Sequence, residues 1–501
     1  MRRLNTLVLS SGLSVLAACG AAPDSQDYSQ DYSQDYSQDY SQDYSREFDA
    51  NVAGLQAKVL CSETFVAGRD PADVQAAELS SPNLHPAVER VTAEILEETG
   101  VKGAQASAGG TTRFAVFRGQ YGCSIVPEAY DLSALVRGDL HDPALYRQKD
   151  AWGAPENTAN ARHAALQGLA EATLENPNAL ASGRTRALLI MRNGALLAEA
   201  YAPGFGPERP MASYSMGKAL TNALVGILVQ KEMIDLKAPV PVDAWQGAHD
   251  PRREITVEHL LHMSAGLDTE YAGRSDMGSP AMSALFGSLD PEHYALSSRL
   301  RQPPGTLSWY SNANTFALMH IVRTRVGGGM ADLQRFIMEE LFKPLGMQHS
   351  MIEFNAYGTP MTTSFNYVSA RDWARFGQLY LNDGVVNNRR ILPAGWARYT
   401  RTPLASSKDR TFGAHWHVNA GRSAGHADPE HQGKNDRPPI KSVPEDALFA
   451  LGDSGQSLMV VPSMNLIVVR LGQLRPPGEG WNYTAFLDDL MDSLLSQEAG
   501  G

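Results

Sequence analysis

Apolar residues recur at intervals of three and four along several stretches of the chain, which is the spacing of one buried helix face. In the stretch Met211–Gln230 this spacing predicts a helix that starts at or near Ser215; its apolar positions are Leu220, Ala223, Leu224, Ile227 and Leu228. Further helices are predicted at 159–174, 333–346, 369–384 and 481–495. Ser369–Gly384 begins at a serine suited to cap a helix and stops at a glycine.

Other stretches favour strands or loops. Thr185–Tyr201 holds two apolar runs joined at Asn193-Gly194, a dipeptide typical of a two-residue hairpin turn. Ala447–Gly472 has the pattern of two strands flanking a turn. The polar residues 418–446 before it are rich in Gly, Pro and His and are interpreted as a long loop.

A small module at 48–158 precedes a larger domain, which we expect at 159–497. Within the module, Arg113–Arg118 alternates like a strand, and Pro86–Thr99 has the pattern of a helix. No catalytic combination of residues is visible in it.

The module contains two cysteines, Cys61 and Cys123, and the chain has one other, Cys19. In an oxidising compartment such a pair indicates a disulfide. On the chain-entropy argument, closing a loop of this length stabilises the fold by about 4 kcal/mol. The alternative is two unpaired buried thiols.

The first residues resemble the signal of a bacterial lipoprotein. Met1–Arg3 is positively charged, Leu4–Val15 is apolar, and Leu16–Cys19 has the Leu-Ala-Ala-Cys order of a lipobox. The likeness implies a signal peptide at 1–18 and a lipidated Cys19. The protein would then be a lipoprotein anchored to a membrane of the bacterial cell envelope, facing the periplasm. The alternative is a plain secretory signal with an incidental cysteine, and under either reading the protein leaves the cytoplasm.

A repeat follows the signal. The tetrapeptide Ser-Gln-Asp-Tyr occurs five times from Ser25 to Tyr44. It has no apolar periodicity and one negative charge per unit, so it cannot form a core. We interpret residues 19–47 as a disordered acidic tether.

Composition narrows the class of partner. The 501 residues are 43% hydrophobic and 20% charged, which is typical of a soluble globular protein with more than one folding unit. A net charge of −12 without a dense basic cluster argues against nucleic acid as a partner. No apolar stretch beyond the first residues has the length of a membrane span. Nothing in the sequence indicates an oligomeric state.

Two polar residues of the stretch Met211–Gln230, where a helix is predicted to start at or near Ser215, are candidates for catalysis. Ser215 and Lys218 are three residues apart and would share one helix face. A serine hydroxyl is a poor nucleophile until a base removes its proton, and a lysine is such a base only if its pKa falls far below about 10.4. Burial and a helix N-terminus both disfavour the ammonium form. The spacing alone also fits a surface serine and lysine on an ordinary helix.

Further motifs follow this pair in a fixed order. They are S-x-x-K at Ser215–Lys218, a segment similar to ITxxHLLxHTSGL at Ile255–Leu267, P-P-G-T at Pro303–Thr306, Y-x-N at Tyr310–Asn312, and G-x-x-G-Q at Gly452–Gln456. With them, the chain from about 159 to 495 resembles the superfamily of serine β-lactamases and penicillin-binding proteins. It is most similar there to class C β-lactamases, family VIII esterases and 6-aminohexanoate-dimer hydrolases. The resemblance implies an α/β (α+β) fold of the β-lactamase/transpeptidase type, with an antiparallel sheet flanked by helices and an all-helical region.

The resemblance also implies roles for single residues. Ser215 would attack a carbonyl and form an acyl-enzyme, with Lys218 and Tyr310 sharing the role of general base. Substrate would contact Asn312, Asp453, Ser454 and Gly455. The oxyanion hole would consist of the backbone N–H groups of Ser215 and Gln456. No cofactor and no metal is needed; His415 and His417, two apart in FGAHWH, are a less favoured metal pair.

The third motif departs from the superfamily. Where K-T-G or H-x-G supplies a cation, this chain has Asp453. That cation helps to hold the carboxylate of a β-lactam, and an anion would repel it by several kcal/mol, of the order expected for close charges near a protein surface. The alternative is that the register slips by one residue and Asp453 points elsewhere.

We therefore expect a secreted serine hydrolase that acts on a small-molecule ester or amide. Within the same fold, the alternative is a D-Ala-D-Ala carboxypeptidase or a β-lactamase. A non-catalytic envelope protein that binds cell-wall peptides is the alternative from another class. The complete set of Ser215, Lys218, Tyr310 and Asn312 argues against it.

Overall fold

The computed structural model describes residues 39–79, 91–96, 101–127, 164–175, 184–268, 277–287, 290–405, 411–419, 440–473 and 483–495. Cys19 and the repeat up to residue 38 lie outside these residues, so the expectations for them stay predictions. Residues Ser45–Gly501 form one unit, which contains both the leading module and the larger domain.

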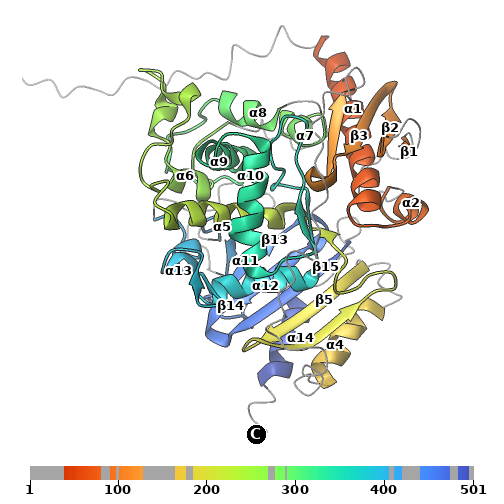
Figure 1. The fold of residues 1–501 in the computed structure, drawn as a ribbon, viewed down its shortest axis with the longest axis vertical. Helices are drawn as coiled ribbons and strands as arrows, with labels where there is room; N and C mark the ends of the chain where they lie inside the picture. Colours follow the sequence, from red (N-terminus) through yellow and green to blue (C-terminus); the bar gives the residue numbers. More distant parts are fainter. Residues whose placement is uncertain are drawn as a thin grey trace, which may run out of the picture. The chain divides into compact units, whose positions relative to one another are not determined.

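A six-stranded antiparallel sheet forms the base of the larger domain (Figure 1). Its strands, in spatial order, are β12 (His417–Val418), β13 (Leu448–Leu451), β14 (Ser457–Val461), β15 (Leu466–Gln473), β5 (Arg184–Arg192) and β6 (Ala195–Tyr201). Asn193 and Gly194 join β5 to β6 with positive φ angles of 52° and 75°, which confirms the predicted hairpin. The region 447–472 holds three strands where two were predicted, because a second turn ends at Asn465 in the left-handed conformation.

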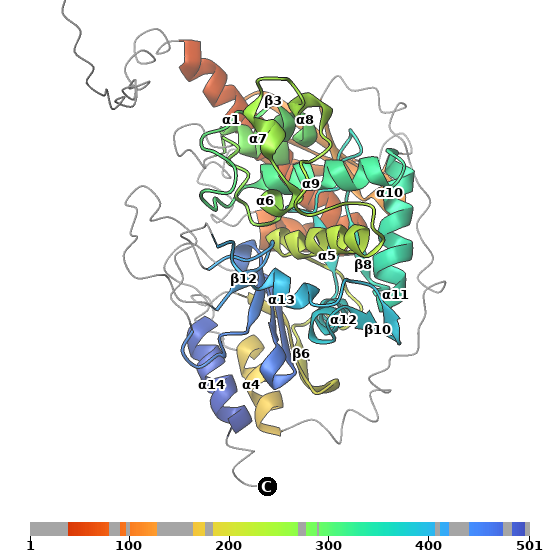
Figure 2. The same ribbon diagram turned by 90° about the vertical axis from the view of Figure 1, so that its left-hand side faces the viewer.

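Helices cover both faces of this sheet (Figure 2). Along β5, Leu188 and Ile190 face one way, towards α4 (Ala164–Glu175) and α14 (Tyr483–Leu495). Leu189 and Met191 face the other way, into the main core. Alternate residues of a strand point to opposite faces, so a strand buried on both sides is apolar throughout.

The helix α12 (Ala370–Leu381) covers the second face of the sheet. The hydroxyl of Ser369 accepts a hydrogen bond from the Asp372 N–H, which confirms the predicted cap. The all-helical region lies beyond it. Its helices are α5 (Gly217–Gln230), α6 (Val257–Leu261), α7 (Pro280–Phe286), α8 (Pro291–Ser297), α9 (Asn312–Arg325), α10 (Met330–Ile337), α11 (Lys343–Leu345) and α13 (Trp396–Thr400).

Short strands complete the larger domain. The order in a three-stranded sheet is β7 (Met211–Ala212), β9 (Asn366–Val368) and β8 (Ser350–Ile352). A small hairpin pairs β10 (Val385–Val386) with β11 (Arg389–Arg390). The three-stranded sheet leads directly into α5, because β7 ends two residues before the turn at Tyr214.

The leading module is a helix packed on a four-stranded antiparallel meander. Its elements are α1 (Asp39–Phe65), α2 (Pro71–Val74), β1 (Thr92–Leu96), β2 (Gly103–Ala108), β3 (Thr111–Phe117) and β4 (Cys123–Pro127). Buried apolar residues of α1 pack against β2 and β3, and a disulfide joins Cys61 of α1 to Cys123 of β4. The structure therefore contains the predicted disulfide and not two unpaired thiols.

Two predictions for this module differ from the structure. Pro86–Thr99 was expected to be helical, but its residues 92–96 form β1, which pairs along its whole length with β2. Pairing with a neighbouring strand outweighs the local helical pattern. The tether was expected to reach residue 47, but α1 begins at Asp39, and the buried positions that stabilise this helix start at Ala50.

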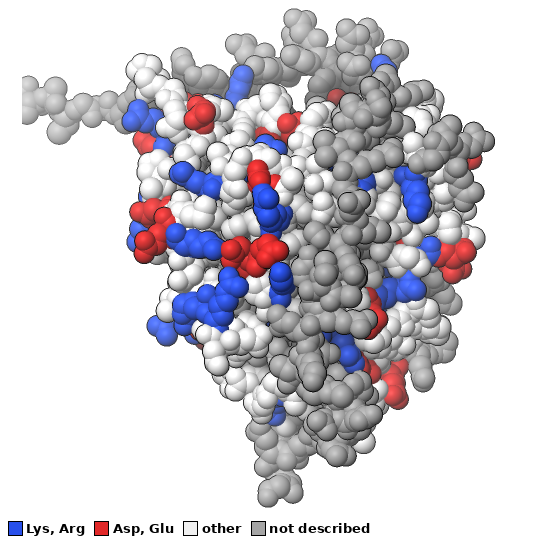
Figure 3. Space-filling view, in the orientation of Figure 1, with Lys and Arg blue, Asp and Glu red and all other residues white. Residues whose placement is uncertain are grey.

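Charges of both signs are interspersed over the described residues of the face in Figure 3. Among the surface ion pairs, Lys231 and Arg389 both contact Glu340, at 2.9 and 3.1 Å. Among the described helices, none has the length and apolar character needed to cross a membrane.

The helix α5 is fixed in the core by Asn222, whose side chain is fully buried. Its amide oxygen accepts hydrogen bonds from the Tyr380 hydroxyl (2.6 Å) and the Trp396 indole N–H (2.9 Å), and its amide nitrogen donates to the Ala414 carbonyl (2.9 Å). Three neighbouring segments are thus tied to one side chain.

We predict that Asn222→Leu lowers the free energy of unfolding by about 2–6 kcal/mol, because the substitution removes the short-range acceptor of two buried donors at about 1–3 kcal/mol each. Equilibrium unfolding in urea measures the change. Gln230→Leu, at the exposed end of the same helix, is the control and should change stability by less than about 0.5 kcal/mol. Equal losses in both variants would contradict this account of α5.

Candidate active site

Ser215 lies in a single turn of 3-10 helix, Tyr214–Met216, that leads into α5. Tyr214 has a φ of 48°, a left-handed conformation that non-glycine residues rarely adopt. The Asn366 side chain holds this turn, because its amide nitrogen donates to the carbonyls of Tyr214 (3.0 Å) and Thr362 (3.1 Å). A Cβ on Gly217 would lie 2.0 Å from that nitrogen, so only glycine fits between serine and lysine here.

Lys218 is buried one turn further along, with its amine directed at the serine. Its Nζ donates to Ser215 Oγ (3.0 Å) and to the Thr363 carbonyl (3.3 Å). It also lies 4.7 Å from the centre of the Tyr310 ring, over its face. Burial lowers the pKa of Lys218 to about 7. Near neutral pH, a large fraction of this amine is therefore unprotonated and able to accept the serine proton.

Tyr310 comes from a different part of the chain, directly before α9. The hydroxyl of Ser311 caps this helix by accepting from the Ala313 N–H (3.1 Å), which sets the direction of the chain at Tyr310. Desolvation raises the pKa of Tyr310, and the nearby Ser215 hydroxyl lowers it by a smaller amount, so the phenol is neutral at pH 7.

The third motif lies against the nucleophile turn. A Cβ on Gly452 would lie 2.3 Å from the Ser213 carbonyl oxygen, which shows how closely the two segments approach. Asp453 is exposed, and its carboxylate accepts from the Ser454 N–H (2.7 Å). Its charge raises the pKa of both Tyr310 and Tyr214. The carboxylate is therefore within electrostatic range of Tyr310.

A buried arginine, Arg470 of β15, lies beneath this motif. Its guanidinium donates to the carbonyls of Ser454 (3.2 Å) and Gly455 (2.9 Å) and to the Thr185 hydroxyl (3.1 Å). The carbonyls of two predicted substrate-binding residues thus point to Arg470. Sequence reasoning missed this residue, although a lone charge in the apolar run LIVVRLG was a usable signal.

The predicted oxyanion donor Gln456 closes the same turn. Its backbone N–H donates to the Asp453 carbonyl at 3.4 Å, the long end of the range for a hydrogen bond. Its side-chain oxygen accepts from the Gly472 N–H (2.9 Å), so the side chain is directed into the sheet. An oxyanion would compete with the Asp453 carbonyl for the backbone N–H.

The two histidines of FGAHWH have different surroundings. His415 is buried, and its Nδ1–H donates to the Leu261 carbonyl (2.7 Å) while Nε2 accepts from the Thr315 hydroxyl (3.0 Å). Both ring nitrogens are therefore engaged, and burial lowers its pKa to about 3. His417 is half-buried, and its ring is stacked on that of Tyr310 with centres 6.1 Å apart. Within the described residues, no three His, Cys, Asp or Glu side chains are grouped to hold a metal ion.

Known proteins are similar to this chain in sequence and fold. A family model described as beta-lactamase matches residues 171–493. The chain belongs to the beta-lactamase family. The match and the architecture confirm the superfamily and the fold expected from the motifs.

Individual members of the superfamily are only distantly similar. A 6-aminohexanoate-dimer hydrolase from Paenarthrobacter ureafaciens is 28% identical over 221 residues, which cover 42% of this chain and 56% of that protein. The chain thus spans little more than half the length of the curated relatives that it matches. Similar solved structures include a penicillin-binding-protein homologue from Caulobacter crescentus (15% identity, 68% of this chain and 98% of that one, TM-score 0.47). A class C β-lactamase from Rhodobacter sphaeroides is another (17% identity, 66% and 99%, TM-score 0.44).

Of the sequence-predicted residues of this β-lactamase-family site, Ser215 and Tyr310 both contact Lys218. Asn312 is half-buried at the first position of α9, two residues beyond Tyr310. Sequence reasoning did not identify Thr363, which acts through its backbone carbonyl. A main-chain acceptor leaves no signal in the type of side chain.

We predict that the rate of Ser215 modification by a fluorophosphonate rises with pH through about 7 and then levels off. The reason is that Lys218 accepts the serine proton only when unprotonated, and its pKa is about 7. Lys218→Arg should lose the reaction, because a guanidinium stays protonated.

The labelling rate measured between about pH 5.5 and about 9 checks this, since an unperturbed lysine would titrate near 10.4. Lys231→Arg, an exposed lysine just after α5, is the control and should keep the wild-type profile. A rate that climbs steadily towards pH 10 would contradict a lowered pKa.

Proposed function

We propose that the protein is a serine hydrolase that cleaves ester or amide bonds through an acyl-enzyme on Ser215. The observation that carries this proposal is the 3.0 Å contact between the buried Lys218 amine and Ser215 Oγ. Among the described residues, no carboxylate forms an ion pair with this amine, so its affinity for a proton is set by burial. A buried amine with this environment is a general base for the serine beside it.

The first step follows from these contacts. Lys218 Nζ takes the Ser215 proton as Oγ attacks the substrate carbonyl carbon, and the carbonyl oxygen becomes negative. The N–H groups of Ser215 and Gln456 stabilise that oxygen, the latter by exchanging its long bond to Asp453. The neutral Tyr310 hydroxyl donates a proton to the leaving group. In the second step the same groups, with protons reversed, activate the water that releases the acyl group.

Asp453 favours uncharged or cationic acyl donors. Its carboxylate is near enough to Tyr310 to raise the pKa of that phenol, so a substrate carboxylate at the same place would be repelled. The similar protein from Paenarthrobacter ureafaciens is a 6-aminohexanoate-dimer hydrolase. Short amide oligomers of that kind therefore belong in a substrate panel beside nitrophenyl esters, D-Ala-D-Ala peptides and a chromogenic cephalosporin.

The nucleophile is tested by labelling. Wild type should form a covalent adduct with a fluorophosphonate probe, and Ser215→Ala should not, because the attacking oxygen is lost. Intact-protein mass spectrometry measures the adduct. Ser213→Ala, two residues earlier, is the matched control and should be labelled; its hydroxyl contacts the Trp373 indole instead of Lys218. Labelling of Ser215→Ala at the wild-type rate would contradict the proposal, and a protein without any adduct or turnover would favour a cell-wall peptide-binding role.

The role of Asp453 is tested by a ratio of substrates. Asp453→Lys should raise kcat/KM for a carboxylate-bearing β-lactam relative to a neutral ester by about tenfold or more, since reversing one close charge changes the interaction by a few kcal/mol. Asp453→Asn should change the ratio part of the way. Asp332→Asn, at a half-buried position in the first turn of α10, serves as the control. A ratio that is the same in all variants would mean that Asp453 does not select the substrate.

A further inference from the structure

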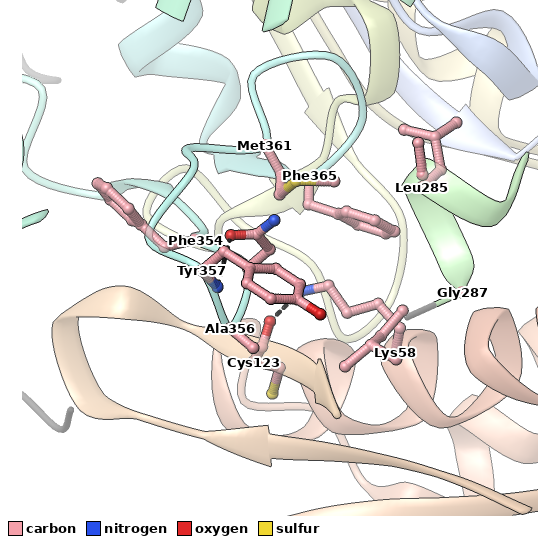
Figure 4. A pocket seen from close by; sticks show the side chains of 12 residues that line it. Lys58, Cys123, Leu285, Gly287, Phe354, Ala356, Tyr357, Met361 and Phe365 are labelled. Carbon is pink, nitrogen blue, oxygen red and sulfur yellow. Dashed lines mark hydrogen bonds between the residues drawn. The ribbon is translucent and has the colours of Figure 1, made fainter. Parts of the chain in front are cut away.

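The short turn Met361–Phe365 lies between the active site and the leading module. On one side, the Thr363 carbonyl accepts hydrogen bonds from Lys218 Nζ (3.3 Å) and Ser215 Oγ (3.4 Å). On the other side, Met361 and Phe365 line a pocket together with Lys58 of α1 (Figure 4). One turn of backbone therefore contacts both regions.

Glu353 holds both ends of this turn through its backbone. Its N–H donates to the Phe365 carbonyl (3.0 Å), and its carbonyl accepts from the Met361 N–H (2.8 Å). The place of the Thr363 carbonyl is thus determined by the place of Glu353.

The Glu353 carboxylate is bound in turn by the leading module. It is fully buried and accepts from Lys58 Nζ (2.5 Å), the Ser62 hydroxyl (3.0 Å) and the Cys123 backbone N–H (2.6 Å). Lys58 Nζ also donates to the Cys123 carbonyl (2.6 Å), a bond drawn in Figure 4, and lies 4.4 Å from the centre of the Phe365 ring. The disulfide between Cys61 and Cys123 joins the two segments that supply these donors.

We infer that Glu353 is a positioning residue for the acylation step: clamped by Lys58, Ser62 and Cys123, it fixes the turn whose Thr363 carbonyl orients Lys218 and Ser215. This inference rests on the proposed function and assigns the leading module a part in catalysis. A carbonyl that accepts from both reacting groups holds the serine oxygen and the amine nitrogen in a fixed relative position. A displacement well under the length of a bond changes the rate of such a transfer several-fold, and about 1 Å can cost about a hundredfold.

The clamp can be weakened without touching the reacting groups. Ser62→Ala removes one of the three donors, and we expect it to lower kcat for a nitrophenyl ester about two- to fivefold. Glu353→Gln removes the charge that holds Lys58, and we expect a loss of roughly ten- to thirtyfold. KM should stay within about twofold in both variants, because neither residue is expected to touch substrate. The rate of fluorophosphonate labelling of Ser215 should fall in parallel with kcat.

Folding is controlled separately, since Glu353→Gln leaves Lys58 buried without its partner. The double variant Lys58→Met/Glu353→Gln has no charge at either of these two buried positions. We expect it to be folded by circular dichroism and its labelling rate to be as low as that of Glu353→Gln. Asn51→Ala is the matched control for docking of the module. Its side chain ties α1 to the Met277 carbonyl (2.7 Å) and the Ser283 hydroxyl (2.8 Å) and has no bond to Glu353, so kcat should be unchanged.

Wild-type kcat and labelling in the folded double variant would overturn the inference. So would an equal loss of kcat in Asn51→Ala, since that outcome assigns the effect to docking of the module in general. Neither result bears on Ser215 as the nucleophile. If the proposed function is wrong, the wild type is not labelled. If only this inference is wrong, the wild type is labelled and the Glu353 variants are labelled at the same rate.

Discussion

The proposed chemistry depends on excluding water from the Lys218 amine, which lies beside the Ser215 hydroxyl. In water, Lys218 would be protonated at neutral pH and could not accept the Ser215 proton. Burial alone accounts for the lowering of its pKa to about 7, because no charged side chain among the described residues contributes to the shift. The residues that pack around Lys218 therefore hold it in place and also lower its pKa. A gap that admitted water would raise the pKa of Lys218 again.

Three distant parts of the chain exclude water from this amine. The ring of Tyr310 covers it from the start of α9, the Thr362–Phe365 segment covers it from the side, and the third motif approaches within contact of Ser213. This close packing requires glycine at two positions. A side chain on Gly217 would collide with the Asn366 amide, and one on Gly452 would collide with the Ser213 carbonyl. Arg470 then holds the third motif from beneath through the carbonyls of Ser454 and Gly455. The motifs that lie far apart in the sequence thus mark the places where these three parts meet.

The features that could be predicted from the sequence depend on residues close together in the chain or on the chemical type of a side chain. The hairpin at Asn193-Gly194, the cap at Ser369 and the contact of Ser215 with Lys218 all follow from neighbours within a few residues. Tyr310 was placed by resemblance, since nothing local connects it to Ser215. The missed features depend on long-range pairing or on main-chain groups: β1 is a strand because β2 lies beside it, and Thr363 contributes a carbonyl that every residue possesses. Glu353 gave no signal because its partners are far away in the sequence.

That separation has a consequence for how the chain must be made. Lys58 and Glu353 are 295 positions apart, and β5 pairs with β15, which is close to the C-terminus. A ribosome produces about 5–20 residues per second, so the early segments wait for many seconds before their partners exist. During that interval Lys58 is solvated, β5 has an open edge, and Lys218 is an ordinary cation. The surroundings that lower the pKa of Lys218 therefore form only after the late segments of the chain, which include β15, have been made.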